Sequence, residues 1–240
     1  MNISQLSIII PAFNEADHIF EILQRINQVQ LINQLGKEII IIDDKSTDNT
    51  ISEITRFQKL KPNLNITVYQ QPVNKGKGAA IHKGIELAKG DYIIIQDADL
   101  EYDPEEYNLL LKPIFKAKAD VVYGSRFIGG NPHRILFFWH SIGNKFLTML
   151  SNVFSDFNLT DMETCYKLFR TDLLKKIPLQ EKRFGFEPEV TAKISRIEKI
   201  KLYEVGISYY GRTYNEGKKI NWQDGLRAIY CILKYGMLKM

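Results

Sequence analysis

Residues 91–104 decide the fold, and they read Asp-Tyr-Ile-Ile-Ile-Gln-Asp-Ala-Asp-Leu-Glu-Tyr-Asp-Pro. Residues 92–95 form a short apolar run rich in β-branched side chains, which is typical of a buried strand. Acidic side chains then follow at every second position, as Asp97, Asp99 and Glu101. If the extended backbone continues, all three point the same way. The sequence therefore predicts a buried strand that ends in a row of carboxylates.

Carboxylates this close together repel one another unless a cation lies between them. Oxygen ligands suit Mg²⁺ or Mn²⁺, and these ions usually keep coordination positions open for substrate phosphates. In open α/β sheets, ligands bind beyond the carboxyl ends of the strands. We therefore expect Asp97, Asp99 and Glu101 to hold a divalent metal ion that binds a nucleotide diphosphate. The alternative is a solvated acidic turn that caps the next helix, because residues 103–106 form a good helix start.

The first hundred residues alternate between apolar strands and amphipathic helices. Strands are predicted at residues 6–10, 38–42, 65–69 and 92–95, and residues 39–42 are all isoleucine. An uninterrupted apolar run of this kind fits a parallel strand that is covered on both faces. This pattern predicts a mostly parallel α/β sheet flanked by helices.

Polar residues follow several of these strands. Asn14 is a candidate N-cap for a helix reaching residue 35, and Glu15 either contacts a ligand or complements that helix dipole. Asp44 follows the isoleucine strand, where a carboxylate can accept hydrogen bonds from a nucleobase or ribose. The glycines of residues 74–80 allow backbone N–H groups to approach a ligand, and either Lys75 or Lys77 can neutralise a phosphate.

The second half of the chain is more aromatic. Residues 135–154 predict an amphipathic helix that either lies at a membrane surface or packs on the sheet. A helix from residue 184 to 197 carries Glu187 and Glu189 in its first turn, where acids are common. A late strand is predicted at residues 201–208, and a last helix begins at residue 222.

Composition excludes several classes of protein. The chain has 240 residues, 45% of them hydrophobic, and a net charge of +4 that does not suggest nucleic-acid binding. Its two cysteines imply no disulfide framework and favour a reducing compartment. Neither a signal peptide nor a run of about 18 apolar residues is present, so no bilayer-spanning helix is expected.

Five motifs follow one another along the chain: IIIPAFNE at residues 8–15, IDDKSTD at 42–48, NKGKG at 74–78, DAD at 97–99 and GSR at 124–126. In their order and spacing, these motifs resemble those of the family 2 glycosyltransferases of the GT-A fold, in the branch of the dolichyl-phosphate mannose synthases and polyprenyl-phosphate glycosyltransferases. The resemblance covers essentially the whole chain. It implies a single domain over residues 1–240, with a nucleotide-sugar-binding half at 1–127 and an acceptor half at 128–240 that carries amphipathic helices.

The resemblance also implies roles for individual residues. Those expected to bind the nucleotide sugar are Pro11, Phe13, Glu15, Ile42, Asp44, Lys77, Asp97, Ala98 and Asp99. Those expected to hold the phosphate of the acceptor are Arg126, Arg134, Arg212 and Lys218. Asp99 and Arg126 are the expected catalytic residues, and Mg²⁺ or Mn²⁺ the expected cofactor.

The expected reaction moves a sugar from a UDP- or GDP-linked donor to a polyprenyl phosphate, such as dolichyl or undecaprenyl phosphate. A phosphate acceptor is largely ionised at neutral pH, so it needs no general base, and we expect single-displacement, inverting transfer. The protein would be cytoplasmic and attached peripherally to the inner face of the membrane. One alternative is transfer to a saccharide or protein hydroxyl with Glu187 or Glu189 as the base. Another is a non-catalytic nucleotide-sugar-binding protein.

Overall fold

A seven-stranded sheet organises the molecule. The computed structural model describes residues 3–130, 132, 134, 135, 137–212 and 222–237. Within them the strands are β1 (Gln5–Ala12), β2 (Gly36–Asp43), β3 (Ile66–Gln70), β4 (Tyr92–Ile95), β5 (Val121–Ser125), β6 (Lys167–Arg170) and β7 (Leu202–Gly206). Their order across the sheet is β3-β2-β1-β4-β6-β5-β7. All neighbours are parallel except where β6 pairs antiparallel with β4 and β5. The mostly parallel α/β sheet expected from the sequence is therefore confirmed.

The central strands are buried on both faces, which explains their continuous apolar sequences. Ile39 to Ile42 of β2 and Ile8 to Ile10 of β1 are almost wholly inaccessible to solvent. Residues of the two strands pair in parallel register, with Ile8 opposite Ile39 and Pro11 opposite Ile42. Burial of both faces fits helices on either side of a parallel sheet.

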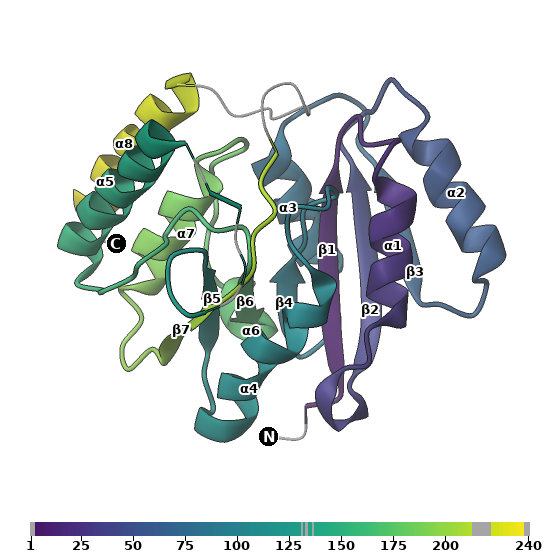
Figure 1. Ribbon diagram of the computed structural model, residues 1–240, viewed down its shortest axis with the longest axis horizontal. Helices are drawn as coiled ribbons and strands as arrows, with labels where there is room; N and C mark the ends of the chain where they lie inside the picture. The colour runs from purple at the N-terminus through teal and green to yellow at the C-terminus, as the bar shows by residue number, and fades with distance from the viewer. Residues whose placement is uncertain (1–2, 131, 133, 136, 213–221, 238–240) are drawn as a thin grey trace.

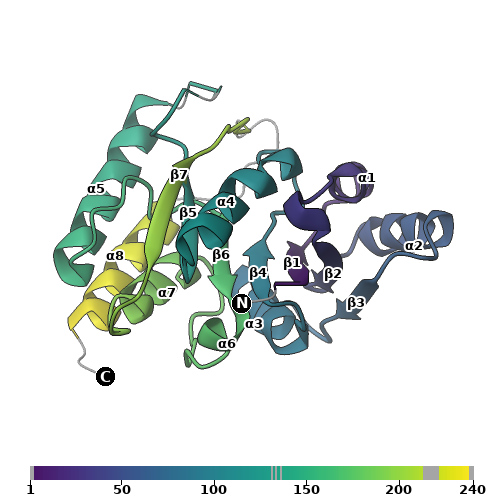
Figure 2. The same ribbon diagram turned by 90° about the horizontal axis from the view of Figure 1, so that it is seen from below.

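Helices cover the two faces of the sheet in separate groups (Figure 1). One face carries α1 (Ile19–Gln28), α2 (Thr50–Leu60) and α4 (Tyr107–Ala117), and the other carries α3 (Lys77–Leu87), α6 (Thr171–Leu174) and α7 (Phe186–Ile194), as Figure 2 shows. Short 3₁₀ turns lie at Ile32–Gln34 and Pro104–Glu106. Two long helices, α5 (Phe138–Ser155) and α8 (Trp222–Met237), pack on each other and on α7, outside the sheet layers.

The helix expected between residues 14 and 35 is shorter than predicted. It begins at Ile19 and ends at Gln28. Asn14 does not cap it, because Asn14 adopts a left-handed backbone conformation with φ of 51°. Its side-chain oxygen instead accepts a hydrogen bond of 2.8 Å from the backbone N–H of Thr47. The residue thereby joins the loops after β1 and β2.

Strand β6 was not predicted. It reads Lys-Leu-Phe-Arg, is four residues long, and begins with a lysine that is fully buried. Its antiparallel insertion between β4 and β5 brings the preceding residues, 161–166, to the carboxyl end of β4. This placement contributes several side chains to the site described below.

The aromatic segment at residues 135–154 forms most of α5, which packs on α7 and α8 rather than on the sheet. Its outer side chains remain exposed. No helix within the described residues is long and apolar enough to cross a bilayer.

Candidate active site

The carboxyl ends of β1, β2 and β4 meet at one edge of the sheet, the upper edge in Figure 1. Backbone hydrogen bonds extend the pairing beyond the strands: the N–H of Asp44 donates to the carbonyl of Ala12 at 2.8 Å, and that of Gln96 donates to Ile9 at 2.9 Å. The loops carrying Glu15, Asp44 and residues 97–101 are therefore held side by side. This edge holds most of the polar residues singled out from the sequence.

Asp44 fixes the glycine-rich loop. Its carboxylate accepts hydrogen bonds from the backbone N–H groups of Lys75 at 2.8 Å and Gly76 at 2.6 Å, and from the side chain of Gln71 at 2.8 Å. Gly78 packs so tightly that a Cβ there would lie 2.3 Å from the carbonyl oxygen of Glu181. The loop glycines thus have a packing role, and two of the amides expected to face a ligand bind Asp44 instead.

Lys77 and Asp97 form the first ion pair of the site. The Nζ of Lys77 lies 2.7 Å from Oδ1 of Asp97 and 3.8 Å from Oε1 of Glu187. It also lies 3.8 Å from the thiol sulfur of Cys165. Burial alone would raise the pKa of Asp97, but the Lys77 ammonium outweighs burial and holds that pKa below its usual range. Asp97 is therefore ionised at neutral pH.

Arg212 faces three carboxylates at once. Its Nη2 lies 2.6 Å from Oδ2 of Asp99, its Nε 3.3 Å from Oε1 of Glu101, and its Nη1 3.7 Å from Oε2 of Glu15. The backbone N–H of Arg212 also donates to Glu101 at 2.8 Å. Burial and the neighbouring charges of Asp97 and Glu101 nevertheless raise the pKa of Asp99 to about 7.

Asp97, Asp99 and Glu101 differ in how well they fit a divalent cation. Among the described residues, no group of three His, Cys, Asp or Glu side chains lies close enough to hold a metal ion. The predicted third ligand, Glu101, accepts hydrogen bonds from the Tyr209 hydroxyl at 2.7 Å and from Arg212. Asp97 and Asp99 still supply hard oxygen donors whose mutual repulsion a divalent ion would relieve. The donor set fits a metal held by Asp97 and Asp99, whereas Glu101 is held by protein groups.

Arg126 is placed differently from its expected role. Its Nε and Nη2 each lie 2.7 Å from a different oxygen of Asp161, and its backbone N–H donates to the same carboxylate at 3.0 Å. Both residues are buried. The prediction of an acceptor-binding, catalytic Arg126 overlooked this partner, which lies 35 residues away in sequence. Arg126 therefore anchors the loop before β6 through Asp161. Its contact with an acceptor phosphate stays a prediction.

Arg134 and Arg212 lie close together. Nη1 of Arg134 donates to the carbonyl of Gly211 at 2.9 Å, and its backbone N–H donates to Tyr209 at 2.7 Å. The two predicted phosphate-binding arginines therefore belong to one neighbourhood. Lys218, the fourth predicted member, lies outside the described residues.

The apolar residues expected at the nucleotide sit at the strand ends. Pro11, Ile42 and Ala98 are buried, whereas Phe13 is 36% exposed at the rim of the edge. Phe13 is therefore the one of these four that presents a substantial surface to a base or ribose. The contacts with a nucleotide stay a prediction.

The two candidate bases, Glu187 and Glu189, lie in different environments. Glu189 is fully buried and accepts hydrogen bonds from the backbone amides of Gln180 and Glu181 and from Lys193. It is a structural anchor. Glu187 instead lies beside Lys77 and so next to Asp97.

Sequence reasoning missed the groups that come from residues 161–166. Asp161, Glu163 and Cys165 reach the site because β6 inserts next to β4. Their only signal was an unusual density of charge in a stretch without a clear period.

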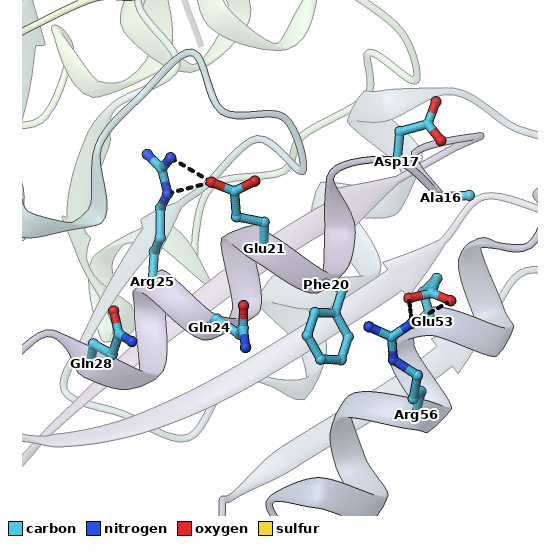
Figure 3. Close-up of a pocket in the computed structure, with 9 residues that line it drawn as sticks. All are labelled: Ala16, Asp17, Phe20, Glu21, Gln24, Arg25, Gln28, Glu53 and Arg56. Carbon is cyan, nitrogen blue, oxygen red and sulfur yellow. Dashed lines mark hydrogen bonds and ion pairs between the residues drawn. The ribbon is translucent and has the colours of Figure 1, made fainter.

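A surface groove of about 540 Å³ lies between α1 and α2 (Figure 3). Two ion pairs line the groove, one between Arg25 and Glu21 and one between Arg56 and Glu53. The guanidinium of Arg56 also lies over the ring of Phe20, 3.9 Å from its centroid. It contains none of the residues predicted to bind substrates. The groove is therefore separate from the candidate active site.

Comparison with known proteins agrees with this geometry. The model of the family described as glycosyl transferase family 2 matches residues 7–178. A dolichol-phosphate mannosyltransferase of Pyrococcus furiosus is 26% identical over 96% of the chain, which spans 64% of that protein. A dodecaprenyl-phosphate galacturonate synthase of Rhizobium johnstonii is 22% identical over 89% of the chain, which spans 61% of it. The chain thus covers less than two thirds of the length of these two relatives.

Solved structures support the fold. Glucosyl-3-phosphoglycerate synthase of Mycobacterium tuberculosis, bound to Mn²⁺, UDP and phosphoglyceric acid, superposes with a TM-score of 0.74 at 16% identity, covering 100% of this chain and 80% of that one. A mannosyltransferase of Pyrobaculum calidifontis with GDP-mannose and Mn²⁺ gives a TM-score of 0.63 at 19% identity, covering 88% and 58%. The sheet and its flanking helices are those of the GT-A fold. Because the family model matches well over half of the chain, this protein belongs to glycosyl transferase family 2 and is a glycosyltransferase.

Proposed function

We propose that the protein transfers a sugar from a nucleotide-diphosphate sugar to a polyprenyl phosphate, with inversion and with Mg²⁺ or Mn²⁺. The observation that carries this proposal is the arrangement of Asp97 and Asp99 beside Lys77 and Arg212 at the carboxyl edge of the sheet. The two carboxylates at this edge can hold a metal ion, and the two basic side chains beside them can hold phosphate groups. The two relatives named for dolichol phosphate and dodecaprenyl phosphate support the same acceptor class.

The donor would bind across the ends of β1, β2 and β4. Asp97 and Asp99 would hold the metal, which supplies charge stabilisation to the departing nucleoside diphosphate. Lys77, which lies 2.7 Å from Asp97, would add a second positive charge on that side. Solved neighbours with UDP or GDP-mannose and Mn²⁺ are consistent with such a donor.

The acceptor phosphate would bind near Arg212 and Arg134. An alkyl phosphate is mostly doubly ionised at neutral pH, because its second pKa is about 6, and it is then already a nucleophile. Cations that position it are needed more than a base that activates it. The tight engagement of Glu189 and the pairing of Glu187 with a lysine agree with a reaction that needs no general base.

A membrane surface is the expected partner, because a polyprenyl phosphate is anchored in a bilayer. The outer sides of α5 and α8 form what we call the apolar face. Its exposed side chains are Phe138, Ile142, Phe146, Met149 and Val153 on α5, and Trp222, Leu226, Tyr230, Leu233 and Met237 on α8. In both helices the spacing is four, four, three and four residues.

The two rows of the apolar face lie side by side. Phe154 lies against Gly236, near the carboxyl end of each helix, and Figures 1 and 2 show the helices running in the same direction. The charged residues of the two helices are Lys145, Arg227 and Lys234 against Asp224. Paired amphipathic helices with aromatic residues and excess positive charge suit the surface of an anionic membrane. Peripheral attachment at the cytoplasmic side follows from this proposal.

A donor screen tests the reaction. Purified protein, Mn²⁺ or Mg²⁺ and a short-chain polyprenyl phosphate are combined with UDP- and GDP-linked sugars, and release of UDP or GDP is measured. We expect lipid-dependent release from one donor that is lost in Asp99→Asn and kept in Glu105→Gln, a control at an exposed acid of the same loop. Release that does not depend on the lipid, or no release from any donor, would contradict the proposed acceptor.

Sedimentation with anionic liposomes tests the membrane partner. Wild-type protein should sediment with vesicles, and Phe146→Glu combined with Leu226→Glu should stay in the supernatant. Leu60→Glu is the matched control, because Leu60 is an equally exposed apolar residue on α2. Binding that survives the double change, or no binding at all, would count against the apolar face as the membrane contact.

A further inference from the structure

The carboxyl group of Glu163 is not used by the reaction proposed above. Glu163 lies in the loop between α5 and β6, two residues after Asp161. Its Oε1 atom is buried and has no hydrogen-bond partner in the described part of the chain. An ionised carboxylate is costly in this situation, because water cannot reach that oxygen to solvate it.

Four charged groups surround Glu163: Glu187 on α7, Lys167 on β6, Arg126 after β5 and Asp161 in its own loop. Arg126 is already bound on two nitrogens by Asp161, so that pair is neutral. The Nζ of Lys167 donates to the carbonyl of Thr164, not to a carboxylate. Among the described residues, Lys167 is therefore the nearby cation that remains for Glu163, and Glu187 interacts with the same lysine.

Lys77 connects Glu187 to Asp97, one of the two proposed metal ligands. This lysine lies 3.8 Å from Glu187 and 2.7 Å from Asp97. The connected cluster holds three carboxyl groups, Asp97, Glu163 and Glu187, against two lysines, Lys77 and Lys167. One bound proton makes the cluster neutral. The buried Oε1 of Glu163, which has no hydrogen-bond partner among the described residues, makes Glu163 the carboxyl group best suited to carry this proton. Burial, followed by the charge of Glu187, raises the pKa of Glu163 to about 8, in agreement with this assignment.

We propose that Glu163 is a positioning residue that stays neutral during turnover, so that Lys77 remains paired with Glu187 and Asp97 and no further negative charge faces the anionic substrates. This inference rests on the proposed function, because both donor and acceptor carry phosphates. Ionised Glu163 would compete with Glu187 for Lys167, disturb the position of Lys77, and add repulsion against the phosphates. Its neutral form is thus required for tight donor binding.

The pH dependence of kcat/KM tests this role. Wild-type kcat/KM for the donor should fall about tenfold per pH unit above pH 8, as expected for a single ionisation, mainly through a rise in KM. Glu163→Gln is permanently neutral and should keep activity within about threefold at pH 7 while losing the alkaline decline. Glu163→Asp should restore a decline. Glu198→Gln, at an exposed acid, should match the wild type. An unchanged alkaline decline in Glu163→Gln would overturn the proposal.

A second measurement does not depend on catalysis. In protein labelled with ¹³C at the glutamate side-chain carboxyl carbons, one resonance should titrate near pH 8 and should be missing from Glu163→Gln. If all glutamate resonances have titrated below pH 6, Glu163 does not hold the proton and the proposal fails. If the resonance titrates near pH 8 but no lipid phosphate is ever glycosylated, the proton assignment stands and the proposed acceptor fails.

Discussion

The guanidinium of Arg212 lies 2.6 Å from the carboxylate of Asp99 and also faces Glu15 and Glu101. Arg212 comes from the far end of the chain, after β7, whereas Asp99 follows β4 in the middle of the sheet. A cation of the protein thus neutralises the same carboxylate that is proposed to bind a metal. Arginine and metal must therefore compete for Asp99.

Replacing Arg212 by methionine should raise the affinity for Mn²⁺ in the absence of nucleotide. The charge-assisted hydrogen bond to Asp99 is worth about 1.5–3 kcal/mol, so removing it should tighten metal binding about tenfold or more. Titration calorimetry with MnCl₂ measures this change. Arg227→Met, which removes an ion pair with Glu181, serves as the control and should leave Mn²⁺ binding unchanged. Weaker or equal Mn²⁺ binding in Arg212→Met would show that the two cations do not compete.

Arg126→Met should destabilise the fold. It leaves Asp161 buried without its partner, and loss of one member of a buried pair costs about 3–5 kcal/mol. The free energy of unfolding in urea gives the value. Arg25→Met is the control, because Arg25 and Glu21 form an exposed pair one helical turn apart, worth about 0.3–0.5 kcal/mol. If Arg126→Met is fully stable but binds the acceptor poorly, Arg126 binds the acceptor and is not needed for stability.

The sheet was predictable because its signal is local. Ile39 to Ile42 and Tyr92 to Ile95 are continuous apolar runs, and a run of this type needs cover on both faces wherever it lies in the sheet. Strand β6 carries no such signal. Lys167 begins it, and this lysine is buried only because Tyr123, Thr164 and two glutamates from other elements surround it. Such an environment cannot be inferred from the four residues themselves.

Some residues of the candidate site could be predicted from local sequence and others could not. Asp97 and Asp99 could be singled out because they follow an obvious strand at alternate positions. Their partners could not, because Lys77 and Arg212 reach them only through tertiary folding. Side chains that pair over long sequence distances, such as Arg126 with Asp161, have no local pattern. Sequence motifs located the edge of the sheet that carries the site but did not assign the contacts there.

Glutamine substitutions at Glu187 and Glu189 should differ in their effect on stability. Glu189→Gln weakens a buried carboxylate that holds two backbone amides and Lys193, so the free energy of unfolding should fall by about 1–3 kcal/mol. Glu187→Gln should leave stability nearly unchanged and lower kcat with a phosphate acceptor by less than about tenfold, because no general base is required. A loss of 10²–10⁴-fold in kcat, the size of a typical general-base effect, would favour a hydroxyl acceptor.

Glu163 should make stability depend on pH. In the unfolded chain a glutamate has a pKa near 4.5, whereas in the folded protein the pKa of Glu163 is about 8. Between these values the folded state binds more protons, so wild-type stability falls as pH rises and the full loss is present above pH 8. Relative to wild type, Glu163→Gln should therefore gain stability between pH 5 and pH 9, by up to about 4 kcal/mol for a pKa difference of this size. Urea unfolding at both pH values provides the test, and a pH-independent difference would contradict it.

Both tryptophans of the chain should report membrane contact. Trp139 and Trp222 lie in the first turns of α5 and α8 and are 78% and 73% exposed. If the apolar face enters the interface of an anionic bilayer, their environment changes from water to lipid headgroups and acyl chains. Their fluorescence emission should then shift to the blue on addition of anionic vesicles, and brominated lipids should quench it.

The control for this experiment comes from the same pair of variants as the sedimentation test. Leu60→Glu should show the full shift, because α2 lies on the other side of the molecule from α5 and α8 (Figure 2). Phe146→Glu with Leu226→Glu should show none, because two buried charges oppose insertion of both helices. A blue shift without quenching by brominated lipids would indicate that the face is covered by a second copy of the protein rather than by the bilayer. Concentration-dependent sedimentation velocity without vesicles distinguishes that outcome, because self-association needs no lipid.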